Sequence, residues 1–293
     1  MKFGKVENPG EIDFSLPKDH PQTKKVLSQF SSNSFENIAV GCAKWNRTDL
    51  KGFYPRGTKD ELEYYATQFN SIELNASFYR MFPKEQFKTW HDKVGEGFRF
   101  FPKVPRLISH LKRLNETEEL VQDFTENLKP LNEKLGMVFL QMPENFMPKY
   151  IDRLPKFFQS WPSDVPLAFE VRHTDWHNDP VVSDELNSIL MQYNVSNIIT
   201  DSAGRRDLLH MRLTTDTAFI RYNGANHPSD YSRLDDWLER LEIWHKEGLK
   251  NCYFFVHQNV EKASPLLSGY FIEKFNSLFD TQLKIPVTNS TKQ

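Results

Sequence analysis

Short apolar runs alternate with longer amphipathic segments along most of this 293-residue chain. Eight apolar runs predict β-strands, at residues 38–43, 71–78, 98–104, 136–142, 166–172, 197–201, 218–223 and 252–257. The amphipathic segments predict helices at residues 84–94, 115–134, 151–161, 182–193, 233–246 and 261–279, whereas residues 202–217 have the weakest helical pattern. Thr58 with Glu61 forms a predicted capping box, which would begin a further helix before LEYYATQF.

The order of these elements predicts the fold. Strands that alternate with helices imply parallel strands joined by helical crossovers. Eight such units predict a single α/β domain, a (β/α)8 TIM-type barrel over residues 38–283. A doubly wound open sheet is the alternative, but the segment GCAKWNRTD after the first strand has no GxGxxG or phosphate-loop motif. Residues 1–37 are predicted to be a short N-terminal extension with a helix near 22–30, and residues 284–293 a C-terminal tail.

Composition excludes some classes of function. The net charge of -2 gives no general attraction to nucleic acid or to anionic membranes, although a local basic patch is compatible with it. Cys42 and Cys252 are too few for a disulfide framework and fit a reducing compartment. The first residues lack an apolar signal-peptide run, and no stretch approaches the length of a membrane span. We therefore expect a soluble cytoplasmic protein.

Polar side chains stand at the end of nearly every predicted strand. In a TIM barrel these carboxyl ends meet at one mouth, where the active sites of such barrels lie. Residues two apart on a strand share a face, so Glu73 lies with Asn75, and Glu170 with Arg172. The other strand-end candidates are Lys103, Gln141, His173, Asp201, Arg221, Asn223, His257 and Asn259. Individual pairs, such as Glu73 with Arg221, would also serve as structural ion pairs, but buried charges that converge on one mouth indicate a site.

The residue types at these ends indicate the chemistry. The cations Lys103, Arg172 and Arg221 suit a phosphate or carboxylate, which an arginine can hold through two hydrogen bonds. The carboxylates of Glu73 and Glu170 would act as general acid or base, or orient the cations. Aromatic side chains nearby would stack on a ring or a base, although core packing explains most of them.

Several specific chemistries have weaker support. Glu73 and Glu170 would be the carboxylate pair of a retaining glycosidase, but their predicted strands are distant from each other. HExxH and GxSxG are absent, and a divalent metal held by Glu73, Glu170, Asp201 and one histidine has no motif behind it. Lys103 is a candidate Schiff-base lysine. Cys42 is a candidate nucleophile, but a small buried residue is the simpler interpretation.

An ordered series of motifs identifies a family. GCAKW, YYATQFNSIELNASFYR, GFRFFPKVP, KLGMVFLQMPENF, FEVRHTDW and IRYNG follow one another along the chain. In this series the sequence resembles the YecE-like proteins, a domain family of unknown function, over residues 38–278. The resemblance implies a TIM-type barrel and no established reaction. The positions that it carries over are Glu73, Asn75, Tyr79, Lys103, His110, Gln141, Glu170, Arg172, His173, Trp176, Asp201, Arg221 and Gly224. The chain departs from the family pattern at Cys42–Lys44 and His257–Asn259.

We predict an enzyme-like barrel whose mouth binds a small anionic ligand of phosphorylated or nucleotide type, with hydrolysis of an ester or phosphoester as the reaction. The predicted catalytic residues are Glu73, Lys103, Glu170 and Asp201. The predicted ligand-binding residues are Asn75, Tyr79, His110, Gln141, Arg172, His173, Trp176, Arg221, Asn223 and Tyr231. No motif indicates a cofactor. The alternatives are a non-catalytic module for nucleic acid or a protein partner, and a purely structural charge network.

Overall fold

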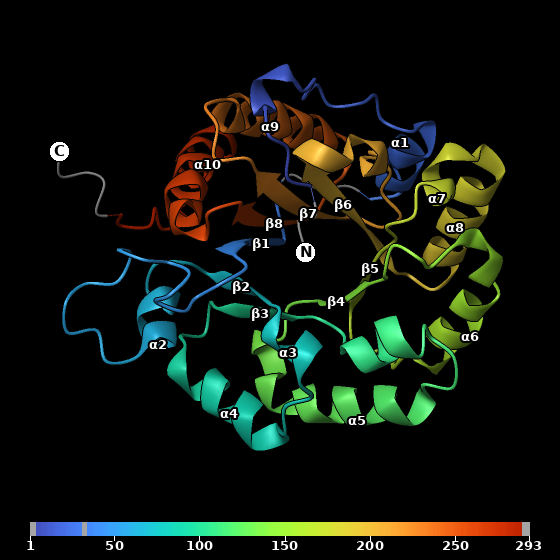
Figure 1. Cartoon of the computed structure of the whole chain (residues 1–293), viewed down its shortest axis with the longest axis horizontal. Helices are drawn as coiled ribbons and strands as arrows, with labels where there is room; N and C mark the ends of the chain where they lie inside the picture. The colour runs from blue at the N-terminus through green and yellow to red at the C-terminus, as the bar shows by residue number, and fades with distance from the viewer. Residues whose placement is uncertain (1–3, 31–33, 289–293) are drawn as a thin grey trace.

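Eight parallel strands form the inner wall of the molecule in a computed structural model that describes residues 4–30 and 34–288 (Figure 1). They are β1 (Asn37–Cys42), β2 (Ser71–Leu74), β3 (Arg99–Pro102), β4 (Val138–Gln141), β5 (Leu167–Glu170), β6 (Ser196–Ser202), β7 (Thr217–Gly224) and β8 (Asn251–Gln258). Hydrogen bonds link them in the order β3-β2-β1-β8-β7-β6-β5-β4. Isolated bridges from Phe100 to Leu135 and from Lys103 to Phe139 join the two ends. The strands thus form a nearly closed barrel, which confirms the predicted TIM-type fold.

Helices surround the strands on the outside (Figure 1). They are α1 (Pro21–Leu27), α2 (Glu61–Ala66), α3 (Ala76–Tyr79), α4 (Lys84–Lys93), α5 (Glu118–Leu128), α6 (Arg153–Ser160), α7 (Asp175–Asn178), α8 (Pro180–Gln192), α9 (Ser229–Glu247) and α10 (Ser264–Phe279). Between β6 and β7 the chain forms only a 3-10 segment, Ala203–Leu208, where the helical pattern is weakest. Within the described residues no helix is both long and apolar enough to cross a membrane.

Some predicted element boundaries are wrong. The capping residue of α2 is Asp60, whose side chain accepts from Glu63 N at 3.0 Å, whereas the Thr58 hydroxyl donates to Pro55 O. The second strand ends at Leu74 and turns directly into α3, so the strand predicted to run to residue 78 is shorter. The helix predicted over residues 115–134 divides into α5 and a 3-10 segment that contains Pro130.

Residues at alternate positions of the strands fill the barrel in layers. An apolar layer inside the barrel consists of Ala39, Phe101, Met137, Phe139, Ala168, Ile198, Phe219, Tyr253 and Phe255. Two residues further along six of these strands stand Lys103, Gln141, Glu170, Thr200, Arg221 and His257. Because side chains two apart share a face, the layer above the apolar one is polar. The fold therefore places a polar layer directly above an apolar one, at the carboxyl ends of the strands.

The N-terminal extension packs against the barrel. Its helix α1 confirms the short helix expected near residues 22–30, and His20 N donates to Met211 O at 3.3 Å. In Figure 1 the blue chain runs from α1 across α9. The predicted extension 1–37 includes residues 1–3 and 31–33, and the predicted tail 284–293 includes residues 289–293, all of which lie outside the described residues. The three domain boundaries stay predictions.

Candidate functional site

One buried arginine joins two carboxylates at the centre of the polar layer. The guanidinium of Arg221 on β7 donates from Nε and Nη2 to the two carboxylate oxygens of Glu73 on β2, each at 2.8 Å. Its Nη1 donates to Glu170 on β5 at 3.0 Å. Arg172 Nε donates to the other oxygen of Glu170 at 2.7 Å. The two carboxylates, which are distant in the predicted strand order, thus meet at one guanidinium.

The electrostatics of this cluster keep its charges fixed. Burial alone would raise the pKa of Glu170, but the charges of Arg172 and Arg221 outweigh it and hold that pKa at about 2. Burial opposes ionisation of Glu73 in the same way, yet Arg221 and His257 lower its pKa well below the usual range. The same carboxylates raise the pKa of Arg221 against the effect of burial. Glu73 and Glu170 are therefore ionised at neutral pH and hold cations, which agrees with the ion-pair alternative for Glu73 and Arg221.

Lys103 extends this cluster through an amide. Its ammonium donates to Gln141 Oε1 at 2.7 Å, and Gln141 Nε2 donates to Glu170 at 2.7 Å. The ammonium also lies 4.3 Å from the centre of the Phe78 ring. Burial, and then the charges of Arg221 and Arg172, lower the pKa of Lys103 to about 7. Lys103 is thus a group of the polar layer that changes its protonation near neutral pH.

The polar layer forms the floor of a cavity of about 640 Å³ at the carboxyl-terminal mouth of the barrel. Its lining includes predicted site residues, namely Asn75, Tyr79, Lys103, His110, Gln141, Arg172, Arg221 and Asn223. Burial, followed by the charges of Lys103 and Arg172, lowers the pKa of His110 to about 4, so its ring is neutral at pH 7. The Tyr79 side chain stands at the rim and is 74% exposed. The convergence expected from the strand ends is therefore present for most of the predicted residues.

Six of the predicted residues do not line this cavity. Glu73 and Glu170 are the buried partners of Arg221, and the other four have different contacts. Trp176 is fully buried, and its indole N–H donates to Phe146 O at 2.7 Å. Tyr231 on α9 packs edge-on against Tyr270. His173 follows β5 and lies 3.5 Å from Asp175. Their contacts are those of packing and loop geometry.

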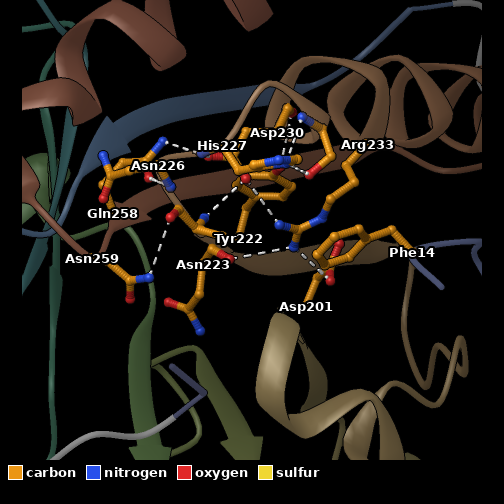
Figure 2. Close-up of polar contacts among 12 residues, drawn as sticks. Phe14, Asp201, Tyr222, Asn223, Asn226, His227, Asp230, Arg233, Gln258 and Asn259 are labelled. Carbon is orange, nitrogen blue, oxygen red and sulfur yellow. Dashed lines mark hydrogen bonds and ion pairs between the residues drawn. The ribbon is translucent and has the colours of Figure 1, made fainter. Parts of the chain in front are cut away.

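Asp201, the fourth of these residues, points to the outer face of β6. Ile198 faces the barrel interior, so Thr200 does too and Asp201 does not. Its carboxylate accepts from Arg233 Nη2 and from the Trp237 indole, both at 2.8 Å. Figure 2 shows Asp201 and Arg233 in this second cluster, with Phe14 beside them. Asp201 therefore lies between the barrel and α9, away from the mouth.

A second carboxylate, Asp230, fixes the loops on one side of the mouth (Figure 2). It accepts from Ala225 N at 2.9 Å, from His227 N at 3.2 Å and from the Gln258 amide at 3.2 Å. These contacts tie the loop after β7 to the end of β8. The amide of Asn223 points away from this network in Figure 2 and lines the cavity instead.

The structure does not bring together Glu73, Glu170 and Asp201, the carboxylates of the alternative divalent-metal site. Arg221 stands between Glu73 and Glu170, and Asp201 faces the outer helices. Among residues 4–30 and 34–288 no three histidine, cysteine, aspartate or glutamate side chains are placed to hold a metal ion. Cys42 is fully buried, and burial raises the pKa of its thiol to about 12, so the core interpretation of this residue is the better one.

Some residues of the mouth were not among the predicted catalytic or ligand-binding residues. His257, one of the strand-end residues, lies 3.2 Å from Glu73 Oε2. Ser202 lines the cavity, and neither its hydroxyl nor that of Thr200 has a hydrogen-bond partner within the described residues. Lys5 lines the cavity from the N-terminal extension. Counting in twos from Ile198 would have found Thr200 and Ser202, whereas no local signal marks Lys5.

Comparison with known proteins identifies a family of unknown function and similar chains. A family model described as "Protein of unknown function DUF72" matches residues 39–290. UPF0759 protein YecE of Escherichia coli K12 is 31% identical over 242 residues, which are 75% of this chain and 86% of that protein. UPF0759 protein YunF of Bacillus subtilis is 25% identical over 201 residues, 64% of this chain and 71% of its own.

Solved structures show the same fold. A DUF72 family protein from Thermotoga maritima superposes with a TM-score of 0.65 at 24% identity, and covers 84% of this chain and 100% of its own. A DUF72 family protein from Enterococcus faecalis also reaches a TM-score of 0.65, at 19% identity, over 84% of this chain and 98% of its own. At this identity the likeness concerns the fold alone.

Proposed function

We propose that this chain, which belongs to the DUF72 family of proteins of unknown function, binds a small anionic ligand of the phosphate-ester type at the mouth of its barrel. The observation that carries this proposal is the charge balance of the buried polar layer. Arg221 and Arg172 offset the charges of Glu73 and Glu170 through direct contacts. Lys103 is the further cation, and its contact is the neutral amide of Gln141.

A bound anion would supply the charge partner of Lys103. Within the described residues Lys103 makes no ion pair, so its ammonium is buried at a cost that the low pKa expresses. An anion beside Nζ would stabilise the charged form and raise that pKa again. Phosphate suits such a position because each of its oxygens accepts hydrogen bonds from cationic and neutral donors. Binding of the anion is therefore coupled to uptake of a proton near neutral pH.

Other residues of the cavity position the charged groups or contact the ligand in this proposal. Arg221 was predicted to clamp the anion, but each of its three nitrogens already donates to a carboxylate, so it positions Glu73 and Glu170. Neutral His110 and the amide of Asn223 are hydrogen-bonding groups for the ligand. The exposed Tyr79 ring at the rim offers a face for an organic group attached to the phosphate.

Hydrolysis of a phosphoester is the reaction that this arrangement supports best. Glu73 and Glu170, as fixed anions, cannot deliver a proton at pH 7. Protonated Lys103 can deliver a proton at this pH. In the step that we assign to it, a water oxygen bonds to phosphorus, the bond to the leaving oxygen breaks, and the Lys103 ammonium protonates that oxygen. The amine then takes up the proton that the attacking water releases. A cytoplasmic location is part of this proposal and is supported by the two free thiols, Cys42 and Cys252.

Calorimetric titration with inorganic phosphate, followed by assay of a chromogenic phosphomonoester, tests the proposal. Lys103→Met is expected to weaken phosphate binding at least about tenfold, because it removes a buried charge-assisted contact. Lys156→Met is the matched control, since Lys156 is exposed on α6 and distant in sequence from every lining residue. Equal phosphate affinity in all three proteins would refute the anion site. Salt-dependent binding of single-stranded DNA without turnover would favour the non-catalytic module instead.

A further inference from the structure

We infer that the N-terminal extension completes the ligand site, and that Lys5 is a second cation that contacts the bound anion. This inference rests on the proposed function, because it assigns a further residue to the same cavity. Lys5 lines the mouth together with Lys103, and it makes no ion pair within the described residues. The family match begins only at residue 39, so Lys5 comes from a segment outside the part of the chain that matches the family.

The extension is held in place by the second buried cluster. Arg206 donates to Phe14 O at 3.1 Å and to Ser15 O at 2.9 Å, and its guanidinium also pairs with Asp201. The Phe14 ring lies 4.3 Å from the guanidinium carbon of Arg233, the other partner of Asp201 (Figure 2). Asp201 thus organises two arginines that anchor the extension. Asp201, the strand-end carboxylate that points away from the mouth, therefore has a structural role in holding the extension.

The start of the described chain is fitted closely to the end of β6. Gly204 N donates to Gly4 O at 2.9 Å. Gly4 has a φ of +71°, and a Cβ built on it would lie 1.7 Å from Ser202 Oγ. A Cβ on Gly204 would lie 3.0 Å from the carbonyl carbon of Gly4. A side chain at residue 4 would clash with Ser202, and one at residue 204 would crowd the backbone of Gly4. The backbone of residue 4 thus reaches the polar wall of the cavity, and Lys5 follows directly.

A lysine at this place adds positive charge where the proposed anion binds. Lys5 is exposed, so its charge is partly screened by solvent and its contribution is smaller than that of buried Lys103. We expect its removal to weaken phosphate binding roughly fivefold at low ionic strength, and less at high ionic strength. Phosphate binding by the variant without Lys5 should therefore depend less on ionic strength than binding by the wild type. A merely structural segment would leave that dependence unchanged.

The experiment compares variants of the full chain by calorimetric titration with inorganic phosphate. Lys5→Ala removes the charge, Gly204→Val displaces the segment, and Lys18→Ala is the control because Lys18 is exposed in the same extension but does not line the cavity. The first two variants are expected to lose affinity to the same extent, and the double variant no more than either, while Lys18→Ala binds like the wild type. Thermal unfolding verifies that each variant is folded.

The outcomes separate this inference from the function that it rests on. Unchanged phosphate affinity in Lys5→Ala, with a loss in Lys103→Met, would overturn the part of Lys5 and leave the anion site standing. Tighter binding in Gly204→Val would overturn the inference in the opposite sense, because the segment would then block the mouth. A wild-type chain that binds no phosphate would overturn the proposed function itself.

Discussion

The substitution Lys103→Met is expected to stabilise the protein at low pH much more than at high pH. Lys103 is buried, and its pKa of about 7 lies below the ordinary value of 10.5. A lysine whose pKa falls on folding binds a proton more readily in the unfolded chain. Its cost to stability is therefore fully present below pH 7 and disappears as the pH rises towards 10.5. Methionine has a similar length and carries no charge, so it removes this cost.

The size of the effect follows from the shift in pKa. One pKa unit corresponds to about 1.4 kcal/mol, so burial of the charged ammonium costs on the order of 5 kcal/mol at pH 6. At pH 9 the folded lysine is neutral and the unfolded one still protonated, which leaves a cost of roughly 2 kcal/mol. The stabilisation by Lys103→Met should therefore fall by roughly 3 kcal/mol between pH 6 and pH 9. Gln141 loses its donor in the variant at every pH, so that loss does not alter the difference.

Urea unfolding of the wild type, Lys103→Met and Lys156→Met at pH 6 and pH 9 measures this difference. The control variant should change little with pH, because Lys156 is exposed. A stability difference between Lys103→Met and the wild type that is the same at both pH values would refute the reasoning. It would mean that the ammonium is solvated or paired in the folded protein. Repeating the measurement with saturating phosphate should reduce the advantage of the variant, since the anion stabilises the charged lysine.

Other expected outcomes concern the rest of the buried layer. Arg221→Met should lower the free energy of unfolding by about 3–5 kcal/mol, because it leaves the Glu73 and Glu170 carboxylates buried without their shared cation; a loss below about 1 kcal/mol in urea unfolding would contradict this. The stability difference between the wild type and Glu170→Gln should hold from neutral pH down to the ordinary pKa of 4.5, and then shrink as the pH falls towards about 2, the pKa of Glu170. A constant difference down to pH 3 would show that this carboxyl is not held ionised. Iodoacetamide at pH 8 should leave Cys42 unmodified in the native protein and label it after unfolding, since burial raises the pKa of its thiol to about 12; rapid native labelling would disprove its burial.

The amino-acid pattern alone determined the barrel and the level of its polar layer. Eight apolar runs separated by helical segments admit few other arrangements, because parallel strands need crossover connections, and a barrel places the crossover helices on its outer face. The two-residue period of a strand then sets Lys103 above Phe101 and Arg221 above Phe219. These are local rules, and they act on neighbouring residues of one strand.

The tertiary structure alone decided which of those residues act together. Glu73 and Glu170 come from separate strands, and only closure of the barrel brings both to Arg221. Asp201 stood last in its predicted strand, but the face of a strand end depends on counting in twos from a known interior residue, and that count sends it outward. Lys5 reaches the mouth only because the extension folds back over α9. Such contacts join residues far apart in the chain, so no local pattern encodes them.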